Sequence, residues 1–244
     1  MMTLKRHLFA LGLVALSPAA FSSGLLSGAP EEGYEGNIDL GYISTSGNTE
    51  TESLNGQFDW VARASENWAT GIQITGVTNS SRAQRDAEQY TFAWNNRYDI
   101  SDNSFFYGIL DYKNDYFGAY DYQAGAYLGY GHQVFKSDDG HLSLGFGLGY
   151  RINAVFVGRD EKENVLRGDL DFAHQLTDTA RFTQVISAVW GEEVDTYVSK
   201  SAISTKISEN LAMKLSYVVN YNSVVPAGAV KTDRTTTVGI SYSF

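Results

Sequence analysis

The sequence predicts a single all-β domain, a closed antiparallel transmembrane β-barrel of about twelve strands. Three observations predict it. The N-terminus reads as a secretory signal, stretches of alternating apolar and polar residues recur along the rest of the chain, and the last stretch ends on Phe244. Barrel strands alternate between lipid and lumen, so a period of two is expected of them.

Composition excludes several other classes. The 244 residues are 43% hydrophobic and 14% aromatic but only 19% charged, which argues against disorder. The absence of cysteine excludes a disulfide scaffold, a cysteine metal site and a cysteine nucleophile. The net charge of −10 leads us to expect no nucleic-acid partner. The mean hydropathy of −0.24 suits a barrel, because its polar lumen dilutes its apolar exterior.

The N-terminal residues have the three parts of a secretory signal peptide. Lys5 and Arg6 precede an apolar run at 8–16, Pro18 ends the run, and small residues follow at positions 20 and 22. The run is shorter than the roughly 20 residues that a membrane-spanning helix needs. We therefore expect a signal peptide over 1–22, a flexible N-terminal segment over 23–35 and the barrel over 36–244.

Alternation then predicts the strands in order. The clearest is 141–152, where Leu142, Leu144 and Phe146 face one way and glycines face the other. Most segments are close to the roughly 9–11 residues that a tilted spanning strand needs. The expected strands are 36–45, 52–63, 68–78, 88–98, 104–113, 122–134, 141–152, 164–175, 181–190, 196–206, 211–222 and 234–244.

The connections between these strands alternate in kind. Tight turns rich in Ser, Asp, Asn and Gly alternate with longer connections, which is typical of periplasmic turns and outer loops. Both termini then lie on the periplasmic side. The longer connections are expected at 79–87, 114–121, 154–163 and 223–233. Aromatic residues of the apolar face fall into two bands, one near each membrane surface.

The C-terminal strand carries a further signal. Its apolar face ends on Tyr242 and Phe244, with Gly239 on the opposite face, which resembles the C-terminal signal of bacterial outer-membrane barrels. We therefore expect a barrel in the outer membrane of a Gram-negative bacterium, surrounded by lipid and lipopolysaccharide. Its C-terminal strand is the expected binding element for the barrel-assembly machinery.

Several motifs resemble the family of domain of unknown function 481, the salt-induced outer-membrane proteins. They are Leu40-Gly41-Tyr42, the stretch from Ser46, Gly47, Asn48 and Thr49 to Thr51, the run 145–151, and residues 225–233. The resemblance spans about 36–244 and implies an outer-membrane barrel, with no substrate or catalytic residue attached. Ser46-Gly47-Asn48-Thr49 itself is first a hairpin turn, because Gly and Asn accept positive φ.

Catalytic chemistry has little support in the sequence. Apart from His7 in the signal peptide, the histidines are His132, His141 and His174, and all three are interpreted as interfacial residues. No serine lies in a Gly-x-Ser-x-Gly elbow and no histidine pair has zinc spacing. We expect no enzyme activity, no catalytic residue, no metal and no cofactor.

The polar register of the strands carries the charged residues of functional interest. Opposite charges there would either pair and fill a small barrel or line a conduit that selects solutes. The residues are Asp39, Asp59, Arg63, Arg97, Asp111, Arg151, Arg167, Asp169, Asp171 and Lys214.

Two function hypotheses follow. One is a narrow passive channel for ions or small polar solutes, and the other is a plugged structural or envelope-stress barrel without transport. An outer-membrane enzyme is a distant third. The acidic stretches 160–163 and 192–195 are interpreted as solvated outer loops, with divalent-ion binding as the less favoured alternative. The oligomeric state is left open.

Overall fold

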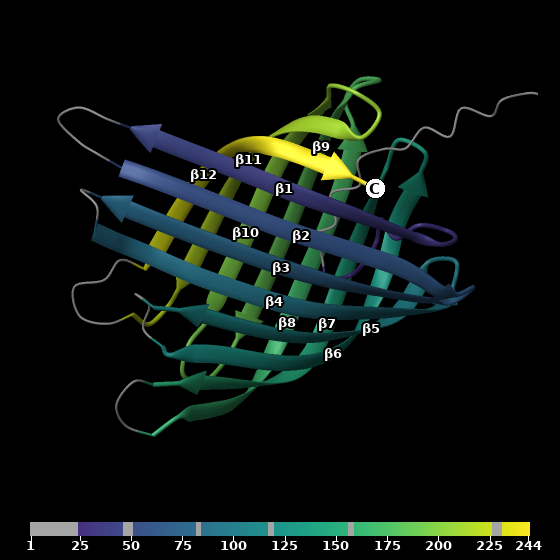
Figure 1. Cartoon of the computed structure of the whole chain (residues 1–244). Helices are drawn as coiled ribbons and strands as arrows, with labels where there is room; N and C mark the ends of the chain where they lie inside the picture. Colours follow the sequence, from purple (N-terminus) through teal and green to yellow (C-terminus); the bar gives the residue numbers. More distant parts are fainter. Residues whose placement is uncertain (1–23, 46–50, 82–83, 117–119, 156–158, 226–230) are drawn as a thin grey trace, which may run out of the picture.

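A closed barrel of twelve antiparallel strands is the architecture of this computed structural model (Figure 1). The structure describes residues 24–45, 51–81, 84–116, 120–155, 159–225 and 231–244. The fold class predicted from the sequence is therefore confirmed. Among the described residues, no helix is long and apolar enough to cross a membrane.

Each expected strand is present, and most are longer than predicted. The connection expected at 79–87 is mostly strand, because β3 continues to Ser81 and β4 begins at Gln84. These extensions are polar, so the alternation that marks a lipid-facing strand is lost there. The strands are β1 Tyr34–Thr45, β2 Thr51–Ser65, β3 Trp68–Ser81, β4 Gln84–Ser101, β5 Ser104–Asp115, β6 Tyr122–Ser137, β7 Gly140–Ala154, β8 Glu161–Gln175, β9 Ala180–Trp190, β10 Thr196–Lys206, β11 Leu211–Asn222 and β12 Thr232–Ser243.

The barrel closes where its first and last strands meet. β1 pairs with β12 from Asn37↔Ser243 to Gly41↔Gly239, next to the C-terminus labelled in Figure 1. Gly36 and Phe244 exchange two backbone hydrogen bonds, at 2.9 and 3.0 Å. The ring of Phe244 lies over Gly36, where a Cβ atom would collide with it. The C-terminal residue therefore seals the end of this seam.

The outer surface of the barrel is apolar and exposed. Leu128 is 75% exposed and Leu148 is 64% exposed, and both belong to a set of large apolar side chains that point outward from every strand. An exposed apolar surface of this extent needs a covering, and a lipid bilayer supplies it for spanning barrels. The strict period of two in the sequence arises from this two-sided environment.

Three aromatic rings lie flat on the inner wall of β5 to β8. Phe105, Tyr107 and Tyr127 are buried and cluster with Leu25 and Ile109. The wall beneath the rings is glycine, because a Cβ atom at Gly129 would collide with Tyr107 and one at Gly131 with Phe105. The glycine-rich strands predicted from the sequence therefore make room for large side chains inside the barrel.

Residues 24–30, within the segment that we expected to be flexible, pack inside the barrel, while residues 31–33 are exposed. Leu25 is fully buried against the aromatic wall, and Leu26 packs with Ala29, Val61 and Ala69. Leu26 has a φ of 48°, a conformation that a bulky residue adopts only when its surroundings fix it. Burial on both sides of the segment provides that constraint. Residues 1–22, assigned to the signal peptide, lie outside the described residues.

Candidate functional site: the barrel lumen

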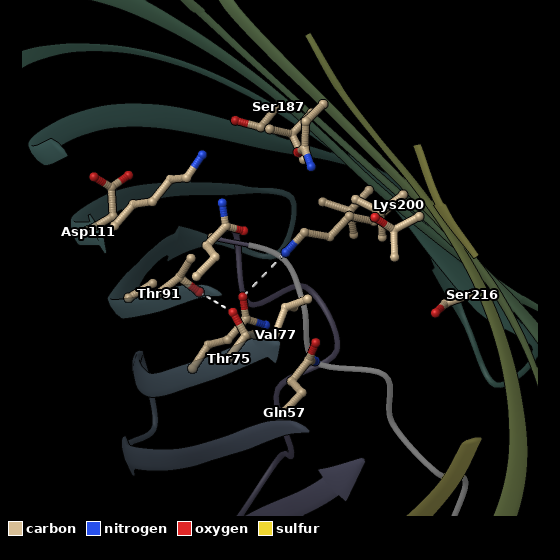
Figure 2. A pocket seen from close by; sticks show the side chains of 18 of the residues that line it. Gln57, Thr75, Val77, Thr91, Asp111, Ser187, Lys200 and Ser216 are labelled. Atoms are coloured by element: carbon tan, nitrogen blue, oxygen red, sulfur yellow. Dashed lines mark hydrogen bonds between the residues drawn. The ribbon is translucent and has the colours of Figure 1, made fainter. Parts of the chain in front are cut away.

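A cavity of about 440 Å³ occupies the lumen above the N-terminal segment (Figure 2). Gly24 lines its inner part, and Asn222 at the outer end of β11 lines its mouth. The cavity is therefore a vestibule that runs from the outer strand ends down to residues 24–33. Its volume falls within the 300–1,000 Å³ that is common for small-molecule sites.

The floor of this vestibule is fixed by two arginines on the inner wall. Arg63 Nε donates to the carbonyl oxygen of Pro30 at 3.0 Å, and Arg97 Nη1 donates to that of Leu25 at 3.5 Å. Both guanidinium groups also bind Asp99, at 2.9 and 2.6 Å. Arg97 stacks over the Phe105 ring at 3.7 Å. Their charges are therefore used to hold the N-terminal segment in place.

The structure places all ten charged residues selected from the sequence on the inner face, and it gives each a partner. Lys214 Nζ lies 2.5 Å from Asp39 Oδ2, and both Asp59 oxygens accept amide hydrogen bonds from Gln57 and Gln73. Arg167 binds Asp169 at 2.8 Å and Asp111 at 3.6 Å, with Tyr127 under its guanidinium group. Many of the charged side chains in the lumen are therefore paired with side chains of opposite charge.

Arg151 and Glu163 form a buried pair near the outer mouth. Arg151 Nη2 lies 2.7 Å from Glu163 Oε1, and the same guanidinium group donates to the Val194 carbonyl oxygen and to Thr196 Oγ1. The backbone N–H of Glu193 donates to Glu163 at 2.9 Å. The pair therefore holds the connection between β9 and β10 over the lumen, with Val194 buried.

The expectation that both acidic stretches are solvated outer loops is therefore wrong in part: Glu163 is buried, whereas Asp160, Glu192 and Glu193 are exposed. Glu161 and Glu163 belong to β8 and point inward, and the connection 191–195 folds toward the lumen. Consecutive acidic residues usually indicate a solvated loop, but here the buried Arg151 on the neighbouring strand β7 compensates the charge of Glu163. No group of three or more potential metal ligands occurs among the described residues.

His141 also differs from its interpretation as an interfacial residue. It is buried, and its Nε2 lies 3.2 Å from Asp171 Oδ1. The register of β6 against β7 shifts between Gln133 and Phe135, next to the turn that His141 follows, and its side chain points inward. His132 and His174 are exposed on the outside.

Lys200 is a lumen cation that the sequence analysis missed. It extends from β10 toward the opposite wall, where its Nζ donates to Gln73 Oε1 on β3 at 3.5 Å (Figure 2). Within the described chain, no carboxylate oxygen lies within 4 Å of this ammonium group. Its neighbours Ser199 and Ser201 are also polar, so apolar and polar residues do not alternate clearly along 196–206. The sequence pattern therefore did not show that Lys200 points inward. The even spacing from Thr196 and Val198 could have revealed it.

Tyr120 lies at the outer rim, beside the strand ends. Its hydroxyl donates to Glu161 Oε2 at 3.1 Å. Burial, with the Glu161 carboxylate beside it, raises the pKa of Tyr120 to about 12. The hydroxyl therefore remains a hydrogen-bond donor at physiological pH.

The remaining residues selected from the sequence do not line a pocket as a group. Ser46, Gly47, Asn48 and Thr49 lie outside the described residues. Gly239 allows close approach of β12 to Leu40, Tyr242 is exposed on the outer face, and Phe244 seals the seam. The last three residues therefore serve barrel closure in this structure.

A closed twelve-stranded antiparallel barrel with an apolar exterior and a polar lumen has the fold of the outer-membrane β-barrel class. Among solved structures, the NanC porin matches 85% of this chain and 98% of its own, with a TM-score of 0.54 and 9% identity. The translocator domain of the autotransporter NalP from Neisseria meningitidis matches 88% of this chain and 90% of its own, with a TM-score of 0.50 and 14% identity. These likenesses support the fold.

The chain belongs to the family described as "Protein of unknown function, DUF481", whose model matches residues 38–244. Among curated proteins, the uncharacterized protein YdiY of Escherichia coli strain K12 is 30% identical over 213 residues. That alignment covers 86% of this chain and 83% of the relative. The family resemblance seen in the sequence is therefore confirmed.

Proposed function

We propose that this protein is a narrow outer-membrane channel for small polar solutes, closed at its periplasmic half by residues 24–33. The observation that carries the proposal is the vestibule of about 440 Å³, which runs from the outer strand ends down to that segment. A structural barrel has no need of such an internal space. Once the expected signal peptide is removed, this segment is joined to the barrel covalently only through β1, so its displacement would open the lumen without breaking a strand pairing.

Outer-membrane location and passage of the chain through an export pathway belong to this proposal. The exposed apolar exterior, the signal-peptide pattern and the fold shared with the NanC porin support it. We infer a non-catalytic role, since His141, the histidine that points into the described interior, binds Asp171 and is not among the residues that line the vestibule. Lipid and lipopolysaccharide around the barrel, and assembly machinery on β12, are proposed partners.

The test is single-channel recording in planar bilayers. We expect small, infrequent conductance steps from the mature wild-type chain and larger, persistent steps from a variant lacking residues 24–33. Glu31→Gln is the matched control, because Glu31 lies in the same segment with its side chain 88% exposed. It should behave as wild type. Folding of each protein is checked by its heat-dependent mobility on gels.

The second candidate function is a permanently plugged structural barrel. The burial of Leu25 among six other apolar and aromatic residues favours it, because removing such a segment from the lumen is costly. A folded deletion variant that stays silent in bilayers would support this alternative and contradict the channel.

A further inference from the structure

We propose that the vestibule is a binding site for a small organic monocarboxylate, with Lys200 as the residue that binds its carboxylate group. The inference rests on the proposed channel function, because it names the solute class for the same lumen. Three observations carry it: an uncompensated cation, hydrogen-bond donors facing it, and an apolar wall beside it.

The first observation is the charge on Lys200. The other cations that line the cavity each lie near a carboxylate: Lys214 near Asp39, Arg167 near Asp169, Arg151 near Glu163, and Lys113 at 3.7 Å from Asp115. Lys200 instead has an amide oxygen at 3.5 Å, which is a weak partner for an ammonium group.

The nearby carboxylate of Asp59 does not fill this role. Gln73 Nε2 donates to one of its oxygens at 2.7 Å and Gln57 Nε2 to the other at 2.5 Å. Asp59 thus holds the two amides in place, and Gln73 in turn presents its oxygen to Lys200. The carboxylate of a bound solute would replace the neutral Gln73 amide oxygen as the partner of Lys200. The ammonium–carboxylate hydrogen bond is the stronger of the two, because both of its partners are charged.

The second observation is the polar wall opposite. β2, β3 and β4 present Gln57, Thr75, Thr91 and Asn95 to the cavity, and Figure 2 shows the first three of these facing the Lys200 side chain. Thr75 and Thr91 share one hydroxyl–hydroxyl hydrogen bond, which leaves one hydroxyl proton over, and Gln57 retains a second N–H beside the one it donates to Asp59, so the wall can donate to the second oxygen of a carboxylate. A site that offers several donors to one anion discriminates against neutral analogues.

The third observation is a group of apolar side chains on the wall from which Lys200 extends, where they lie among polar residues such as Ser187 and Ser216 (Figure 2). β9, β10 and β11 present Val185, Val189, Val198 and Val218 to the same cavity, and Ile109 lies lower down. These side chains give no hydrogen bonds but favour contact with hydrocarbon. An inorganic anion could use Lys200 and the polar donors but gains nothing from the valines, whereas an organic monocarboxylate uses both walls, and the cavity volume suits a molecule of that kind.

Benzoate is a suitable probe, with benzyl alcohol as its uncharged analogue. Calorimetric titration of the folded wild-type chain in non-ionic detergent should show saturable benzoate binding and at least tenfold weaker binding of benzyl alcohol. Lys200→Met should weaken benzoate binding at least tenfold, while Lys200→Arg should retain it. Lys113→Met, which removes a paired cation from the same cavity, is the control and should stay within twofold of wild type.

Three results would overturn the inference: no saturable benzoate heat with folded wild type, equal binding of benzyl alcohol, or undiminished benzoate binding by Lys200→Met. Competition by equimolar chloride would show a general anion site and contradict the organic solute class. A barrel that is silent in bilayers but loses benzoate binding with Lys200→Met would refute the channel and retain the site. A barrel that conducts ions but does not bind benzoate would retain the channel proposal and refute the binding site.

Discussion

At the scale of single residues, glycine on the inner wall determines where the large side chains go. Tyr107 and Phe105 on β5 lie across β6 at Gly129 and Gly131. Glycine normally weakens a strand, since it brings no side chain to pack. Here the neighbouring aromatic ring covers it, so the strand keeps its packing while the ring stays flat against the wall and leaves the lumen open.

Replacing Gly129 with valine should therefore destabilise the barrel. The new side chain would collide with the Tyr107 ring, and overpacking of this kind costs about 1–3 kcal/mol. Urea unfolding in lipid vesicles, followed by tryptophan fluorescence, measures the change. Gly56→Val is the control, because the atom nearest to its Cβ position is 3.9 Å away. Equal stability of the two variants would contradict the packing argument.

At the scale of elements, a connection and two strands are joined by one buried ion pair. Arg151 on β7 and Glu163 on β8 are 5% and 2% exposed, and both bind the connection 191–195. A pair buried this deeply is costly to form and still more costly to break, because the remaining charge has no solvent. Its role is therefore to fix the outer mouth.

Arg151→Met should lower the free energy of unfolding by about 3–5 kcal/mol, since Glu163 is then left buried without its cation. Neutralising the carboxylate as well, in Arg151→Met with Glu163→Gln, should recover part of that loss. Urea unfolding measures both. Lys136→Met, which removes an exposed pair at 3.9 Å, should leave stability unchanged. No recovery in the double variant would show that the charge is not the cause.

At the scale of the whole molecule, the apolar exterior determines the environment. Trp94 lies near the middle of β4, whereas Trp68 begins β3 and Trp190 ends β9, and all three are exposed outward. If the barrel axis is perpendicular to the membrane plane, Trp94 lies in the bilayer core, and Trp68 and Trp190 lie at the two opposite membrane interfaces. Tryptophan favours interfaces, so Trp68 and Trp190 have the expected positions.

Variants that retain one of these tryptophans should show this depth order. Lipids brominated deep in the acyl chain should quench Trp94 more strongly than Trp68 or Trp190, and lipids brominated near the headgroup should reverse the order. Fluorescence after refolding into vesicles measures both. Equal quenching at all three positions would contradict the orientation of the barrel in the membrane.

Most of the fold could be predicted from the sequence, because a wall one residue thick separates lipid from lumen. Every strand must then alternate, and Leu142, Leu144 and Phe146 show the direction of β7 without any tertiary information. The signal weakens where a strand extends beyond the apolar band, as in residues 79–81 of β3. Boundaries were therefore missed there, while the number of strands was not.

The sequence by itself determined the class of the protein, its strands and the inward direction of the ten charged residues selected from it, but not that of Lys200 or Glu163. Only the tertiary structure decided which charges compensate each other, since partners such as Lys214 and Asp39 are far apart in the chain. It also decided that residues 24–30 occupy the lumen and that Lys200 has no carboxylate within 4 Å among the residues that the structure describes. Pairing across a lumen depends on barrel closure and register, and alternation along one strand carries no information about either.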